Sequence, residues 1–408
     1  MTEADSFVRS IIRTAGESPI RAMMGLAGEA GMISLAGGHP DTQQLPRDWL
    51  VEAASTVLGQ LRHSDLQYGA TEGLAALRDS VCALLLQRRI KAEPGDLIIT
   101  TGSQQGMSLL ANAVLDPGDA IAMAPLNYPA AMQCARYAGA RIVTLDAGGE
   151  GLGEVARAAP MRVKAVYVVP NFANPTGHLM PTEARLRLLE DAQRLGILIV
   201  EDDPYGDLWF DRAPPDSLYA MNQMQRIGAT VVYLSSFSKT VMPALRLGLL
   251  CAPPAIRHAV KLVKQAADVH SGLLEQRILD AMLRSGKLTG HLDSIRATYR
   301  LKARTMVEAL RTMAEDHLSF REPSGGMFVW AQLEGDARHV AGADWFAFGR
   351  THRVLVLPGQ AFAADGRSNG YIRLTFANPG VEEIRAGIKR LVAGLNAEST
   401  RIAAHAAN

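Results

Sequence analysis

Short apolar segments alternate with helical segments over residues 96–251, and this alternation limits the possible folds more than any other feature. Each apolar segment has the length of a strand, and most are apolar at every position rather than at every second one. Such strands are typical of a parallel sheet covered by helices on both faces. We therefore predict an α/β fold with strands at Asp96–Thr100, Ala120–Ala124, Ala165–Val169, Ile197–Glu201, Val231–Ser235 and Leu247–Cys251, and with intervening helices that include Ser103–Leu115, Pro129–Tyr137 and Thr182–Leu195.

The pattern changes after a long, charged amphipathic segment at Leu292–Ala314, which predicts a helix. Beyond it, Gly326–Gln332 and Tyr371–Phe376 show the period of two that is expected of strands with one buried face. A chain of 408 residues is also too long for a single core. We expect residues 62–288 to form a large domain, 289–408 a C-terminal small α+β domain, and 1–61 an N-terminal arm that contributes to the small domain.

Composition excludes several classes of partner. With 42 basic and 41 acidic residues the formal net charge is +1, and no dense basic stripe suggests nucleic-acid binding. The three cysteines, Cys82, Cys134 and Cys251, lack metal-ligand spacing and indicate free thiols in a reducing compartment. No secretory signal is recognisable, and the apolar runs are much shorter than a membrane span. We expect a cytoplasmic protein without a metal site, a membrane partner or bound nucleic acid.

A lysine follows one of the apolar strands, in the sequence VVYLSSFSK that ends at Lys239. The carboxyl end of a buried parallel strand delivers its residues to a ligand crevice. An amine placed there loses its proton more easily than in water and becomes a nucleophile for an aldehyde. By itself the pattern is a weak signal, because most lysines that follow a strand are surface residues.

A second strand ends in the sequence LIITTGSQQ, in which a glycine turn opens a helix at Ser103. Free backbone N–H groups and the helix dipole at such a terminus form an anion site. The alternative is that Ser103 only caps its own helix. Neither a Walker phosphate loop nor a glycine-rich dinucleotide motif is present, so a nucleotide is not expected.

Three further segments place polar side chains at strand ends or within a strand. Asn174 lies in the loop ANPTG, where its amide is able to donate to a ring oxygen. The acids of 201–203 end an apolar strand, where burial needs a positive partner such as a protonated ring nitrogen; the alternative is a solvated strand end followed by a turn. Arg373 stands in the alternating strand YIRLTF and suits bidentate capture of a carboxylate, although a structural ion pair or an edge arginine that extends its charged group into solvent is the more common explanation.

The order of these segments resembles the fold-type-I pyridoxal-5'-phosphate (PLP) aminotransferases of class I and II, over residues 33–380. SLAGGHPD (34–41) and QYGATEGLAALRDSV (67–81) are similar to N-terminal signatures of the subgroup that contains 2-aminoadipate, kynurenine and multi-substrate aminotransferases. The resemblance implies a mostly parallel seven-stranded sheet in the large, PLP-binding domain. The motifs that carry it are TGSQQ (101–105), NY (127–128), ANPTG (173–177), EDDPY (201–205), SFSK (236–239) with an arginine seven residues later, and YIRL (371–374).

The resemblance implies that Lys239 holds PLP as a Schiff base and moves protons during the reaction. It also implies that Asp202 pairs with the pyridinium nitrogen and keeps the ring an electron sink. Asn174 and Tyr205 would bind the 3'-oxygen, and Tyr128 would stack on the ring.

The same resemblance assigns the phosphate to Ser103 and Gln104, with Ser236, Ser238 and Arg246 completing its binding site. Tyr68 resembles a tyrosine that enters the phosphate site of a neighbouring subunit, which implies a homodimer with shared active sites. Arg373 would bind the substrate α-carboxylate, and Gly38 would offer backbone donors near the same group.

Two residues bear on side-chain specificity. Arg21 lies where some relatives place an arginine that binds a distal carboxylate, although a solvated helix arginine is the alternative. His39 stands where the subgroup leads us to expect leucine. A histidine there would favour polar or aromatic substrates or would simply cap a loop.

The resulting hypothesis is a ping-pong transamination through the Lys239 aldimine. The donors are aromatic, branched-chain or 2-aminoadipate-like L-amino acids, and the acceptor is a 2-oxo acid such as 2-oxoglutarate. A PLP-dependent lyase or cyclase would need the same residues and stays an alternative. A regulator with a PLP-sensing domain is a weaker alternative, because only some thirty residues precede SLAGG.

Overall fold

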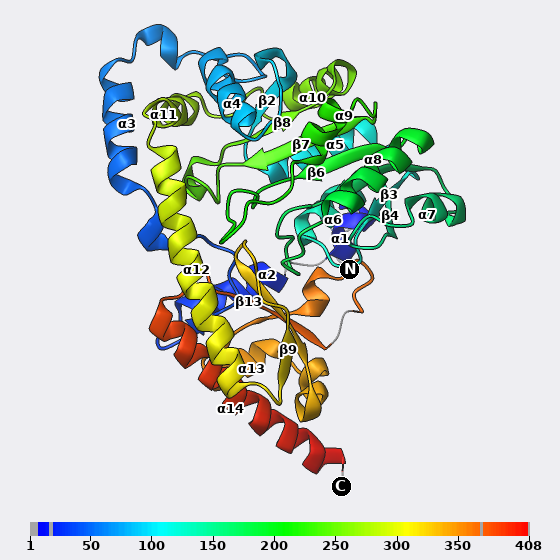
Figure 1. Cartoon of the computed structure of the whole chain (residues 1–408), viewed down its shortest axis with the longest axis vertical. Coiled ribbons are helices and arrows are strands. Elements are labelled where there is room, and N and C mark those ends of the chain that lie inside the picture. The colour runs from blue at the N-terminus through cyan, green and yellow to red at the C-terminus, as the bar shows by residue number, and fades with distance from the viewer. Residues whose placement is uncertain (1–6, 16–18, 368–369, 407–408) are drawn as a thin grey trace.

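The computed structural model describes residues 7–15, 19–367 and 370–406. A large unit built on a seven-stranded sheet occupies the upper part of Figure 1, and a smaller unit lies below it. Helix α12 (Leu288–Met313) runs from one unit to the other. Within the described ranges, no helix combines the length and the apolarity needed to cross a membrane.

The large sheet confirms the predicted α/β class. Its order is β2-β8-β7-β6-β5-β3-β4, and only β8 runs antiparallel to its neighbours. Its strands are β2 (Leu97–Thr100), β3 (Ala120–Met123), β4 (Arg141–Thr144), β5 (Val163–Val168), β6 (Leu198–Asp202), β7 (Val231–Ser236) and β8 (Gly248–Cys251).

Alternate residues of each central strand enter different cores, which explains why the strands are apolar throughout. In β2, Ile98 packs with α5 (Ser103–Val114) and α6 (Pro129–Tyr137), whereas Leu97 and Ile99 face the opposite side. Both sides are covered by helices, as Figure 1 shows. The other helices of this unit are α3 (Arg47–Gly59), α4 (Ala75–Gln87), α7 (Leu152–Ala158), α8 (Thr182–Leu195), α9 (Leu218–Gln225), α10 (Pro254–Ala267) and α11 (Leu273–Arg284).

The smaller unit is built on an antiparallel sheet of order β12-β13-β10-β9. Near it, β1 (Ile33–Ser34) pairs in parallel with β11 (Val354–Leu355), which joins the N-terminal segment to this unit. Helices α12 and α14 pack together beside the sheet. The remaining elements are α1 (Ser10–Ala15), α2 (Pro19–Gly25), β9 (Leu318–Phe320), β10 (Phe328–Leu333), α13 (Trp345–His352), β12 (Leu357–Pro358), β13 (Tyr371–Thr375) and α14 (Val381–Ala406).

Candidate functional site

A cavity of about 640 Å³ lies at the carboxyl ends of β5, β6 and β7, where the small unit meets the large sheet. Open α/β sheets bind ligands at this edge. Twelve of the residues predicted from the sequence line the cavity together: Gly38, Ser103, Gln104, Tyr128, Asn174, Asp202, Tyr205, Ser236, Ser238, Lys239, Arg246 and Arg373.

Lys239 lies in the turn that follows β7, and its side chain reaches the loop after β1. Its Nζ donates to the carbonyl oxygen of Gly38 at 2.9 Å. Burial, together with the positive charges of Arg373 and Arg246, lowers the pKa of Lys239 to about 8. The amine is therefore neutral, and able to attack a carbonyl, much closer to physiological pH than an ordinary lysine.

Asp202 ends β6 and is buried in the floor of the cavity. Its Oδ2 accepts a hydrogen bond of 2.7 Å from the hydroxyl of Tyr167, whereas its Oδ1 has no partner among the described residues. Burial raises the pKa of Asp202 to about 7, against the effect of the Tyr167 hydrogen bond. A ligand that brings a protonated nitrogen to Oδ1 would satisfy this carboxylate.

The N-terminus of α5 faces another part of the cavity. Gly102 precedes the helix, Ser103 is its first residue, and no side chain caps the free N–H groups. The interpretation of Ser103 as the cap of its own helix is therefore wrong, because Gly102 occupies the cap position. A Cβ at Gly102 would lie 3.1 Å from Nη2 of Arg246, so glycine keeps this space open.

Two serines and an arginine complete this anion-binding arrangement. Ser236 donates to the Oγ of Ser238 at 3.0 Å, and Nη1 of Arg246 contacts the same oxygen at 3.4 Å. Free helix N–H groups, hydroxyl groups and a guanidinium are the donors that a phosphate group needs. Gln104 lies beside them and accepts a hydrogen bond of 3.2 Å from the hydroxyl of Tyr128.

Arg373 is 1% exposed and projects from β13 into the opposite side of the cavity. Its Nη1 donates to Oδ1 of Asn174 at 2.7 Å, and its Nη2 donates to the carbonyl oxygen of Ala36 at 2.6 Å. The guanidinium also lies over the ring of Phe328, 4.1 Å from its centroid. No carboxylate of the described residues pairs with Arg373, so the structure gives no support to the alternative of a structural ion pair.

Aromatic side chains form the walls of the cavity between the N-terminus of α5 and Arg373. Tyr205 is buried beside the edge of Phe328, with ring centroids 6.1 Å apart. Tyr128 precedes α6 and also faces the cavity. A flat ligand is therefore enclosed by ring faces and edges while its polar groups meet the residues at either end.

The mouth of the cavity carries His39 and Met24. Partial burial of the His39 ring, together with the nearby positive charges of Lys239 and Arg373, lowers its pKa. The side chain of Arg21 lies outside the described residues, so its predicted role stays a prediction. Tyr68 is 80% exposed on the surface of the large unit and does not line this cavity.

Tyr167 and Phe328 are among the residues of this site that were not predicted from the sequence. Tyr167 lies inside β5, where it looked like one more apolar strand residue, and it contacts Asp202 only because β5 and β6 are neighbours. Phe328 opens β10, whose register with β13 brings it under Arg373. Neither contact has a signal within a single segment, because each depends on the pairing of two strands.

The three cysteines are free, and Cys251 is buried. Among the residues that the structure describes, no group of three or more potential ligands is placed to hold a metal ion.

Both the sequence and the structure match known proteins over nearly the whole chain. Residues 30–391 match the family model described as aminotransferase class I and II. The chain is 35% identical to a 2-aminoadipate transaminase of Thermus thermophilus, over 92% of each protein. It is also 32% identical to aromatic-amino-acid aminotransferase 1 of Thermococcus litoralis, over 93% of this chain and 92% of that protein. The crystal structure of LysN, an α-aminoadipate aminotransferase of Thermus thermophilus in complex with N-(5'-phosphopyridoxyl)-L-leucine, superposes with a TM-score of 0.87 at 32% identity, covering 97% of this chain and 99% of that one.

Proposed function

Because this chain belongs to the aminotransferase class I and II family and is a PLP-dependent transaminase, we propose that the cavity around Lys239 is its active site. The residues of the cavity fit the cofactor. The buried, unpartnered Oδ1 of Asp202 suits the ring nitrogen, and the uncapped N-terminus of α5 with Arg246 suits the phosphate.

When bound, PLP supplies an aldehyde that condenses with amines and a ring that withdraws electrons from the substrate. The protein's residues hold it for that chemistry. Ser103, Gln104, Ser236, Ser238 and Arg246 would bind the phosphate, and Asp202 would keep a proton on the ring nitrogen. Asn174 and Tyr205 would hydrogen-bond the 3'-oxygen, and Tyr128 would stack on the ring.

Lys239 is the group that moves the proton. Its lowered pKa leaves the amine neutral in an appreciable fraction of molecules at neutral pH. A neutral Nζ would accept the proton that leaves the substrate Cα. The resulting ammonium would then act as the acid that gives the proton back in the next step. The carbonyl oxygen of Gly38, 2.9 Å from Nζ, orients the amine in the absence of the cofactor.

The observation that carries the substrate assignment is Arg373, a buried guanidinium without a carboxylate partner in the described chain. We assign it the α-carboxylate of an amino acid, with Gly38 beside it. The relatives are named for 2-aminoadipate and aromatic amino acids, and the LysN complex contains a leucine adduct. On this basis the donors are aromatic, branched-chain or 2-aminoadipate-like L-amino acids, and the acceptor is a 2-oxo acid such as 2-oxoglutarate. Arg21 would bind a distal carboxylate.

We also propose a homodimer with shared active sites. Tyr68 is exposed beside Leu66 and Leu274, which are 73% and 40% exposed, on the surface around a shallow cavity. Their grouping around one cavity supports an interaction surface here. In a dimer, Tyr68 would reach the partner's phosphate. The free thiols support a reducing, cytoplasmic location.

The test is a half-reaction followed by absorbance of the bound cofactor. Each donor amino acid, added without an acceptor, should convert one equivalent of cofactor, and later addition of 2-oxoglutarate should restore the original spectrum. Lys239→Ala should lack both the original band and the conversion. Continuous release of ammonia and keto acid without an acceptor would instead indicate elimination, as expected of a lyase.

A further inference from the structure

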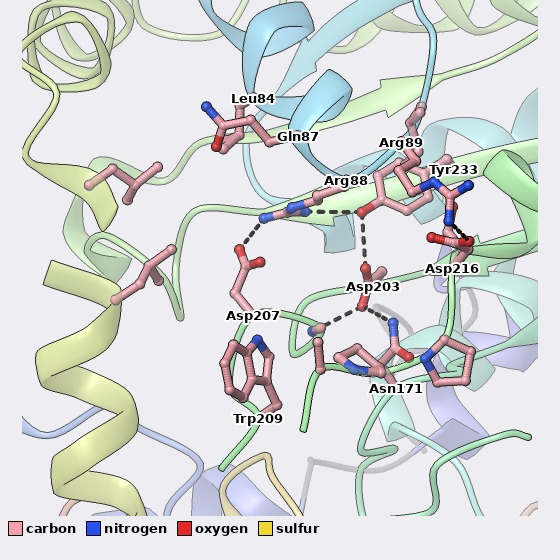
Figure 2. A pocket seen from close by; sticks show the side chains of 18 of the residues that line it. Leu84, Gln87, Arg88, Arg89, Asn171, Asp203, Asp207, Trp209, Asp216 and Tyr233 are labelled. Carbon is pink, nitrogen blue, oxygen red and sulfur yellow. Dashed lines mark hydrogen bonds and ion pairs between the residues drawn. The ribbon is translucent and has the colours of Figure 1, made fainter. Parts of the chain in front are cut away.

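A second cavity, of about 330 Å³, is lined by α4, the start of α12 and the chain that follows β6 (Figure 2). Its arginines already bind carboxylates of this chain: Arg88 pairs with Asp207, Arg89 with Asp216 and Arg296 with Asp293. The cavity therefore offers little free positive charge for a ligand. Its lining also includes a network of polar side chains centred on Asp203.

Asp203 is 6% exposed and follows the proposed ring-nitrogen partner directly in sequence. Its Oδ1 accepts from Nδ2 of Asn171 at 2.9 Å and from the backbone N–H of Gly206 at 3.0 Å. Its Oδ2 accepts from the hydroxyl of Tyr233 at 3.0 Å. Figure 2 shows these bonds converging on one carboxylate. Both oxygens of this buried carboxyl group are therefore occupied by donors from the protein.

Each donor belongs to a different segment of the proposed active site. Asn171 lies three residues before Asn174 in the loop after β5. Gly206 directly follows Tyr205 in the turn after β6. Tyr233 lies in β7, the strand that leads to Lys239.

The ends of this network are fixed. Tyr233 accepts from Nη1 of Arg88 at 3.1 Å, and Arg88 in turn pairs with Asp207 in the turn after Tyr205. On the other side, Oδ1 of Asn171 accepts from Nη2 of the fully buried Arg185 at 2.7 Å. The carboxylate thus joins a loop, a turn and strand β7, and two of its three donors, Asn171 and Tyr233, are themselves held by buried or paired arginines.

Space around the turn is equally restricted. A Cβ at Gly206 would lie 2.6 Å from Oδ1 of Asp203, closer than any real contact. The glycine therefore allows the backbone N–H to approach the carboxylate, and the turn that carries Tyr205 depends on this approach.

We infer that Asp203 is a positioning residue that sets the relative placement of Asn174, Tyr205 and Lys239 around the cofactor ring. The inference rests on the proposed cofactor site, because those three residues must contact the cofactor for their placement to matter. Asp203 itself acts only through its neighbours. A loss of its hydrogen bonds should displace the loops relative to one another without removing any group that touches the cofactor.

The first experiment compares Asp203→Asn with Asp216→Asn in the holoenzyme. Asp216 lines the same cavity and pairs with the exposed Arg89, which makes it a matched control. In Asp203→Asn, an amide N–H group replaces the acceptor for Tyr233. We expect kcat to fall about 10-fold or more with KM changed much less, since small displacements of a reacting group are costly. Visible circular dichroism of the bound cofactor, which reports ring placement, should change, and Asp216→Asn should match wild type in both measurements.

A second variant separates geometry from charge. Tyr233→Phe leaves the charge of Asp203 in place but removes the bond to β7, so it should cause a smaller change in visible circular dichroism. In Asp203→Asn the hydroxyl hydrogen of Tyr233 has no acceptor, and adding Tyr233→Phe removes that hydroxyl. The double variant should therefore be less impaired than the sum of the two single variants predicts.

The outcomes distinguish this inference from the proposed function. A wild-type cofactor signal that is absent in Lys239→Ala, together with unchanged kcat and circular dichroism in Asp203→Asn, would overturn only the positioning role. Conversion of the cofactor by amino acids that survives Lys239→Ala would overturn the proposed site itself. If Asp203→Asn lowers the melting temperature but leaves the cofactor's circular dichroism unchanged, Asp203 serves stability alone and the inference is wrong.

Discussion

Arg373 is the residue whose contacts depend most on its guanidinium shape. It binds Asn174 and the carbonyl oxygen of Ala36 and lies over Phe328. A lysine at this position keeps the charge but loses the planar set of donors. Arg373→Lys should lower kcat/KM for amino acids about 100-fold, within the range found when one member of a buried charge pair is removed. Steady-state kinetics measures the change, and the slow half-reaction with a primary amine that lacks a carboxylate should be unaffected. Equal losses with both substrates would contradict the assignment of the α-carboxylate to Arg373.

Asp202 should make the apoenzyme sensitive to pH. Its folded pKa of about 7 lies above its ordinary value of 3.8, because the carboxylate is buried. The favourable contribution of the protonated form is therefore complete below pH 4 and is lost as the pH rises through 7. Asp202→Asn should accordingly stabilise the apoenzyme at pH 8 by up to about 4 kcal/mol and have little effect near pH 4.

Thermal unfolding of apoenzyme and holoenzyme at both pH values tests this expectation. The same substitution should weaken cofactor binding, so the holoenzyme should lose the stability that the apoenzyme gains. If Asp202→Asn destabilises the apoenzyme at pH 8, burial of the charge is not the dominant effect.

At the scale of elements, β8 and the turn before α5 approach each other unusually closely. A Cβ at Gly248 would lie 2.7 Å from the backbone carbon of Gly102 and 2.8 Å from the backbone nitrogen of Ser103. Gly248→Ala must therefore push the proposed phosphate-binding turn away from the sheet. We expect at least a 10-fold weaker cofactor affinity, measured by equilibrium titration of the apoenzyme, and a loss of about 1–3 kcal/mol in stability.

Gly290→Ala is the matched control for that prediction. Gly290 lies in α12, where a Cβ would have no neighbour within 4 Å. The substitution should leave cofactor affinity unchanged and stabilise the helix by about 0.5–1 kcal/mol. Similar affinities for Gly248→Ala and wild type would mean that the turn before α5 is not part of the phosphate site.

Elements with strong internal patterns could be predicted from the sequence. Helices α6 and α8 begin and end at the predicted residues, and β7 is one residue longer than predicted. The edge strand β4 was missed, because four residues with mixed exposure carry neither an apolar run nor a clear alternation. Helix α12 begins at Leu288 rather than Leu292, since its first turn lacks both an acidic residue and a side-chain cap that would mark the start.

The site was predictable to the extent that its side chains stand at strand ends. Lys239, Asp202 and Asn174 lie at or just after the ends of three neighbouring strands of the sheet, so a parallel arrangement alone brings them together. The bonds from Tyr167 to Asp202 and from Tyr233 to Asp203 were not predictable, because each joins different strands and depends on which face the side chain takes. Strand order and register, rather than residue type, were the missing information.

At the scale of the whole molecule, the surface around Tyr68 is connected to the proposed phosphate site. The ring of Tyr68 contacts His270, with ring centroids 5.9 Å apart. Two residues before His270, Asp268 accepts from Gln105 at 2.6 Å, and Gln105 accepts from the backbone N–H of Thr101 at 2.7 Å. A partner bound at this surface would therefore contact a segment that is rigidly bonded to the turn before α5. Association and cofactor binding should reinforce each other.

Mixed dimers test whether the active sites are shared. Tyr68→Ala should weaken cofactor binding in both sites of its own homodimer, and Lys239→Ala should abolish activity in both sites. In a mixed dimer, the subunit that retains Lys239 receives an intact Tyr68 from its partner, so one site regains every proposed contact. Refolding an equimolar mixture of the two inactive or weakened chains should restore about a quarter of the sites to wild-type cofactor affinity, because half of the dimers are mixed and each has one complete site. Cofactor titration and the half-reaction measure these sites. If the mixture shows only the sum of its two parent homodimers, Tyr68 acts within its own subunit or has no role in the site.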